Sequence, residues 1–148
     1  MRRLSGLLAA ALVAVLVPST SVASADACDT VMLKSYRLSV DVEDKVYRIG
    51  QKAKIHMTVI REQTGTAVSG AMAAVMIIAG REKAVFGVDN TDERGRAFLK
   101  VYLSKEYTKP GPVRLVSYAY KQQANVAACA TVAEYGFKDQ ARAFRVKR

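Results

Sequence analysis

Few residues in this chain combine the type and the spacing that metal binding requires. The only histidine, His56, falls among lysines on the polar side of an alternating pattern, where we expect a solvated side chain. Zinc and copper sites need several histidine, cysteine or carboxylate ligands that converge on one ion. Thioether ligation of copper(I) is an alternative role for the methionines, but methionine far more often fills gaps in a core; the residues concerned are Met32, Met57, Met72 and Met76. We therefore expect no metal site.

The hydroxyl and carboxyl groups offer no better basis for catalysis. Catalytic serines above a sheet stand in a glycine-flanked turn that exposes them. None of the serines beyond the N-terminal segment has this context; they are Ser35, Ser39, Ser69, Ser104 and Ser117. Asp89, Asp92 and Glu93 carry oxygens that suit calcium. Aspartates are also ordinary turn formers, which is the role that we favour here. The sequence thus predicts no catalytic residue, no cofactor and no enzymatic activity.

The two cysteines, Cys28 and Cys129, predict a disulfide bond, because an even number of cysteines in an exported chain is normally paired. The bond would close a loop of about 100 residues, for which the chain-entropy model gives at most about 4–5 kcal/mol. The alternative is that Cys28 is the acylated first residue of a lipoprotein. The preceding residues, Ala25 to Ala27, match a lipoprotein signal poorly, and Cys129 would be left without a partner. We favour the disulfide.

The last residues, GFKDQARAFRVKR (136–148), form the most informative polar segment. Two aromatic residues, Phe137 and Phe144, are interleaved with basic ones, a combination that can bind anionic lipid or a polyanion such as a wall polymer. Nucleic acid is a poorer partner for an exported protein. The candidate anion-binding residues are Lys138, Arg142, Arg145, Lys147 and Arg148. The alternative is a frayed, solvated terminus.

Export is indicated by residues 1–27, which have the order of a signal peptide. Arg2 and Arg3 precede an apolar run without charges (4–17), and small residues follow, with cleavage expected after Ala25 or Ala27. No later run of roughly 18 apolar residues could anchor the chain by a helix. The segment holds two of the 23 Lys and Arg residues and one of the 13 Asp and Glu residues, so a net charge of about +9 remains afterwards. Such a charge attracts anionic partners, or else only maintains solubility.

The pattern of the remaining residues predicts β-strands. Apolar residues alternate with polar ones, or form short runs rich in β-branched side chains, and turn residues separate these segments. About seven short strands are expected, at 36–43, 52–59, 71–78, 84–88, 97–103, 113–120 and 126–132. No helical period appears, so the pattern predicts an all-β antiparallel sandwich of two sheets. In the segment 113–120, Val113 and Leu115 compete with Val116, Tyr118 and Tyr120 for the core.

Three motifs carry a resemblance to known domains. They are YRIGQKAKIHMTV, with its turn at 47–50, GTAVSGAMAAV, and TDERGRAFL, with its turn at 91–95. Together they resemble the bacterial immunoglobulin-like domains of surface proteins and are similar to macroglobulin-type domains, over roughly residues 36–132. The resemblance implies an immunoglobulin-like domain at 28–135, with residues 136–148 as a basic C-terminal tail. Some such surface domains carry a Lys–Asn isopeptide bond; the late segment GPVRLVSYAY lacks the acidic residue that this bond needs, so we do not expect it.

These observations predict a non-enzymatic interaction module that is secreted or held in the cell envelope. Its partner would be an unidentified protein, an anionic envelope polymer or a membrane surface. The alternative is a secreted inhibitor or small-ligand binder of the same fold that acts through loops at one end of the sandwich.

Overall fold

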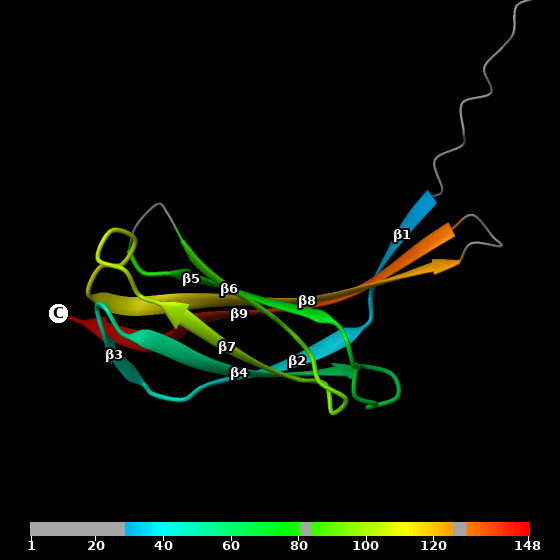
Figure 1. Ribbon diagram of the computed structural model, residues 1–148, viewed down its shortest axis with the longest axis horizontal. Coiled ribbons are helices and arrows are strands. Elements are labelled where there is room, and N and C mark those ends of the chain that lie inside the picture. The colour runs from blue at the N-terminus through cyan, green and yellow to red at the C-terminus, as the bar shows by residue number, and fades with distance from the viewer. Residues whose placement is uncertain (1–28, 81–83, 126–129) are drawn as a thin grey trace, which may run out of the picture.

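The computed structural model describes residues 29–80, 84–125 and 130–148, and its regular structure is β-strand throughout these ranges (Figure 1). The signal-peptide segment 1–27, Cys28 and Cys129 lie outside the described residues. The strands are β1 (Asp29–Lys34), β2 (Tyr36–Val42), β3 (Val46–Arg48), β4 (Lys52–Arg61), β5 (Met72–Ile78), β6 (Val85–Asn90), β7 (Arg96–Tyr102), β8 (Gly111–Asn125) and β9 (Ala130–Lys147).

The strands form two sheets packed as a sandwich, which confirms the predicted fold class. The larger sheet has the order β1-β9-β8-β5-β6, with β3 also paired to β9, and the smaller sheet has the order β2-β4-β7. Pairing is antiparallel except along one edge of β9. There β1 runs parallel to the first residues of β9, and β3 runs parallel to its last residues.

The alternating pattern explains which side chains fill the core between the sheets. In β2 every second residue is buried, and β7 shows the same period, as expected for strands with one face in solvent. In β8 the buried residues are Val113, Leu115, Ser117 and Ala119. Of the two faces that the sequence left open, the one with Val113 and Leu115 is therefore the inner one. The competing side chains Val116, Tyr118 and Tyr120 lie on the outer face of the larger sheet.

The C-terminal segment is a strand inside the larger sheet, whereas the sequence set residues 136–148 apart as a tail. Residues up to Lys147 belong to β9, which pairs with β8 along most of its length. Phe144 and Val146 are only 4% and 1% exposed. They alternate with Arg145 and Lys147, and this two-residue period is that of a strand with one buried face. Of the final expected strand, 126–132, residues 126–129 lie outside the described residues, and 130–132 are the first residues of β9.

One end of the larger sheet continues past the smaller sheet as an arm. In Figure 1, β1 and the adjoining ends of β8 and β9 extend together beyond β2 and β4. β9 passes very close to β2 where the arm meets the sandwich. A Cβ atom at the buried Gly136 would lie 2.4 Å from the backbone oxygen of Tyr36 and 2.8 Å from its Cβ atom. Only glycine fits this crossing.

Candidate functional site

Four of the five cations predicted to bind anions lie along the last residues of β9 and at the residue that follows it. A register irregularity between β8 and β9 follows Val113, so that Phe144 faces this residue and enters the core. The strand then points its basic side chains outward, leaving exposed Arg142, Arg145, Lys147 and Arg148. Lys138 lies apart from them, half-buried, opposite the inward-facing Ser117 of β8. The structure therefore separates this lysine from the other four.

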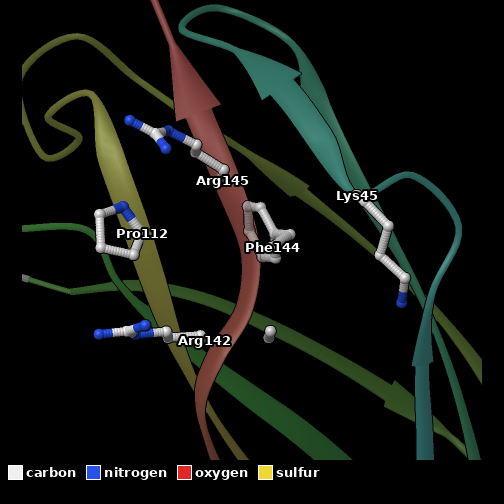
Figure 2. Close-up of a pocket in the computed structure, with 6 residues that line it drawn as sticks. Lys45, Pro112, Arg142, Phe144 and Arg145 are labelled. Atoms are coloured by element: carbon white, nitrogen blue, oxygen red, sulfur yellow. The ribbon is translucent and has the colours of Figure 1, made fainter.

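A shallow surface pocket of about 470 Å³ lies beside β9 at this end of the sandwich. Figure 2 shows Arg142 and Arg145 extending to the same side of β9 as Pro112, while Lys45 comes from the segment before β3 on the other side. The backbone N–H of Arg145 donates a hydrogen bond to the backbone oxygen of Lys45 at 2.9 Å. This bond joins the Lys45 segment to β9 and fixes its position beside the two arginines.

Two further hollows continue this surface around the end of the sandwich. One shares Arg145 with the first pocket and adds Lys147 and Arg148. The other shares Arg148 with the second and adds Lys105 and Lys109 from the segment between β7 and β8. Among the described residues, no acidic side chain lines any of the three. The three hollows form one continuous surface, which we call the basic end, with seven lining cations: Lys45, Lys105, Lys109, Arg142, Arg145, Lys147 and Arg148.

Most of these cations have no ionic partner among the residues that the structure describes. Only Lys45 has a carboxylate within 4.0 Å in the described part of the chain, and that contact, 3.8 Å to Asp41, is between exposed groups. Three arginines elsewhere are paired, namely Arg61, Arg96 and Arg114; Arg96, for example, lies 3.1 Å from Asp92. At the basic end Arg48 and Lys147 are even direct neighbours across β3 and β9. Unpaired cations on a concave surface attract and hold anionic groups, and the arginine forks suit phosphate or carboxylate oxygens.

Three of these cations could not be found from the sequence. Lys45, Lys105 and Lys109 lie in turns far from β9 in the chain, and only the pairing of β3 with β9 and the path of the β7–β8 segment bring them there. No local sequence pattern indicates that these three lysines belong to the basic end. Only the sheet topology shows that they lie close to β9.

A second polar cluster joins the two sheets at the base of the arm. The carboxylate of Glu134 in β9 accepts hydrogen bonds from the hydroxyls of Ser35 and Tyr36, each at 3.1 Å, and from the guanidinium of Arg61 in β4. The bond from Arg61 is the main cause that lowers the pKa of Glu134. Burial, followed by the hydrogen bond to Glu134, raises the pKa of Tyr36 to about 12. This cluster satisfies its own polar groups, so we assign it a structural role.

The acidic turn between β6 and β7 also has internal partners. The Asp92 carboxylate accepts backbone N–H bonds from Arg94 at 2.9 Å and Arg96 at 2.8 Å, and Asp89 accepts one from Phe98 at 3.1 Å. Asp92 thus does what turn-forming aspartates do, whereas Asp89 lies in β6 and connects it to β7. In the described ranges no group of three or more His, Cys, Asp or Glu residues is placed to hold a metal ion. His56 stacks on Phe98, with ring centroids 4.6 Å apart.

The predicted disulfide cannot be seen, because both cysteines lie outside the described residues. Their described neighbours Asp29 and Ala130 are partners in the parallel pairing of β1 with β9. Over residues 29–80, 84–125 and 130–148, no helix is long and apolar enough to cross a membrane. A scan against models of known protein families finds no match to this chain, and a search of curated proteins finds none either.

Proposed function

We propose that this protein is an exported, non-enzymatic binding module that attaches to an anionic partner in the cell envelope through its basic end. The observation that carries the proposal is the continuous surface of three hollows that, among the described residues, is lined by cations and by no acidic side chain. The concavity favours contact with several anionic groups at once, as a polymer or a surface of phosphates or carboxylates would offer. The net charge of about +9 adds long-range attraction to the same partner.

The test of this proposal measures binding to a soluble polyanion. Inorganic polyphosphate is titrated into the processed protein and into a double variant, Arg142→Gln with Arg145→Gln. Each exposed cation near an anionic surface contributes about 1 kcal/mol, so the double variant should bind about 30-fold more weakly. Binding should also weaken steeply with added salt, because screening shortens the reach of exposed charges.

A matched control removes the same charge elsewhere. Arg37 and Arg94 are exposed at positions outside the three hollows, and Arg37→Gln with Arg94→Gln should change affinity by no more than about twofold. Lys138→Gln should also have little effect, because Lys138 lies apart from the basic end. Equal losses for both double variants would show that only net charge matters, and the proposed site would then be wrong.

The proposal includes the Cys28–Cys129 disulfide. The register of β1 with β9 supports it, since the residues that follow the two cysteines are direct partners. Parallel neighbours lie about 5 Å apart, within the Cα separation of roughly 4.4–6.8 Å that disulfides span. Intact-mass measurement of the exported protein without reductant should give a mass two hydrogens below that of the reduced chain. Two free thiols, or a lipid mass on Cys28, would refute the bond.

A further inference from the structure

The outer face of the larger sheet carries apolar and aromatic side chains in consecutive rows. Partners in a sheet point to the same side, so the register identifies these rows. One row runs from Val88 in β6 through Ala74 and Tyr118 to Phe137 in β9. The next rows pair Phe86 with Met76, and Met72 with Tyr120 and Tyr135. This set of residues, from Phe86 to Phe137, is called the aromatic face below.

The aromatic face is exposed, and the core does not need it. Phe86, Val88 and Phe137 are 67%, 64% and 54% exposed, whereas their neighbours along each strand point inward. The ring of Tyr118 stacks on those of Tyr120 and Tyr135 at 6.4 and 6.2 Å between centroids. A contiguous apolar patch of this kind, with tyrosine hydroxyls at hand, is typical of an interaction surface.

The same face is positively charged. Its strand positions include Lys34, whose ammonium lies 5.0 Å from the ring centroid of Phe137. Further along β9 they include Arg145 and Lys147 of the basic end, because Arg145 is the partner of the outward-facing Pro112. At the described strand positions of this face the one acidic residue is Asp139, and Arg114 neutralises it. The aromatic face therefore continues into the basic end without an intervening free negative charge.

We propose that the aromatic face and the basic end together lie on an anionic lipid bilayer, with the aromatic side chains entering the interface and the cations contacting the headgroups. The inference rests on the proposed function and names its partner. Charge decides against a second copy of the chain, since two such faces would bring like charges together. Exposed phenylalanines gain little from a soluble polyanion. At a membrane, tyrosine favours the interface, phenylalanine is typical of the apolar side of interfacial segments, and basic residues favour anionic headgroups.

The experiment compares vesicle binding with polyphosphate binding. The apolar variant carries Phe86→Thr, Val88→Thr and Phe137→Thr, since threonine keeps strand propensity. With vesicles of phosphatidylglycerol and phosphatidylcholine at about 0.5 M salt, where screening leaves mainly apolar contact, it should bind at least about tenfold more weakly than the unmodified protein. Its polyphosphate binding at low salt should be unchanged. Tyr102→Thr is the matched control, an aromatic residue 52% exposed on the outer face of the smaller sheet.

A second measurement does not depend on the triple variant folding. The chain has no tryptophan, so Phe137→Trp introduces a single fluorophore whose emission should shift to the blue on anionic vesicles, while Tyr102→Trp should not shift. Three results would overturn the lipid inference and leave the proposed function standing. The apolar variant could bind vesicles as well as the unmodified protein does, or the emission of Phe137→Trp could fail to shift. The unmodified protein could also bind polyphosphate but not vesicles. If the unmodified protein binds neither vesicles nor polyphosphate, both the lipid inference and the proposed function are wrong.

Discussion

Replacing Glu134 by glutamine should destabilise the fold substantially, although glutamine has nearly the same shape. In the wild-type protein the carboxylate receives three donors, from Ser35, Tyr36 and Arg61. A glutamine side chain offers only one acceptor oxygen and adds an NH₂ group that cannot accept from any of them. At least one donor in a largely buried site is then left unsatisfied, and the charge attraction with Arg61 is lost.

The magnitude follows from the exposure of the two ionic partners. The side chains of Glu134 and Arg61 are 12% and 36% exposed. Removing one partner of a fully buried ion pair costs about 3–5 kcal/mol, and an exposed pair contributes about 1 kcal/mol or less. The present pair lies between these limits, so Glu134→Gln should lower the free energy of unfolding by about 2–3 kcal/mol. This is a large part of the roughly 5–15 kcal/mol typical of a domain.

Urea unfolding at pH 7 measures this difference, with Glu106→Gln as the control. Glu106 is exposed in the segment between β7 and β8, and surface changes of this type usually shift stability by no more than about 0.5 kcal/mol. A loss below about 0.5 kcal/mol for Glu134→Gln as well would refute the structural role assigned to the cluster.

Acid titration gives an independent check on the same residue. Since folding lowers the pKa of Glu134 below its ordinary value of 4.5, its stabilising contribution is complete above that pH and is lost as the pH falls through the lower folded pKa. The gap in stability between wild type and Glu134→Gln should therefore be constant from pH 7 to about 5 and should narrow in stronger acid. A gap that stays constant into strong acid would show that the carboxylate charge contributes nothing.

Three further predictions concern the core and its close contacts. Gly136→Ala should cost about 3 kcal/mol in urea unfolding, because its Cβ cannot fit against the Tyr36 backbone. Thr91→Val should cost about 1–3 kcal/mol, because the buried hydroxyl accepts from the Ala71 N–H at 2.9 Å and donates to the Val68 oxygen at 2.6 Å. With the pKa of Tyr36 raised to about 12, wild-type stability should fall between about pH 10 and 12 by roughly 2–3 kcal/mol more than that of Tyr36→Phe.

The fold class was predictable because apolar and polar residues alternate with a two-residue period in several strands. β2, β4 and β7 follow this period closely, and each was expected within a few residues of its bounds. The two strands that sequence reasoning missed, β1 and β3, carry weak signals. β3 has only three residues, and β1 lies in the arm, where Val31, Met32 and Leu33 are all about half exposed and no buried face imposes alternation.

The C-terminal half of β9 was not recognised as a strand, because its many charged residues do not show a clear two-residue alternation. Between Gly136 and Phe144 the strand passes through the register irregularity, so that the buried positions do not recur at every second residue. A segment with so many basic side chains then resembles a solvated tail. The sequence did single out the cations of this segment as candidate anion-binding residues. Their proximity to Lys105 and Lys109 depends on tertiary contacts, which the spacing of residues in the sequence does not reveal.

The distribution of charge argues that the basic end serves binding rather than folding. Where this protein uses charge for structure, it pairs the groups, as at Glu134 with Arg61 and at Asp139 with Arg114. In the smaller sheet the neighbours Lys54 and Lys100 have Glu43 beside Lys54. Beside the basic end, Arg48 lies opposite Lys147 in adjacent strands, and neither has a carboxylate within 4.0 Å among the described residues, an arrangement that destabilises a sheet. Solubility alone requires only a net charge, which could be spread over the whole surface. Gathering the unpaired cations in contiguous hollows therefore carries a cost in stability that an anionic partner would offset on binding.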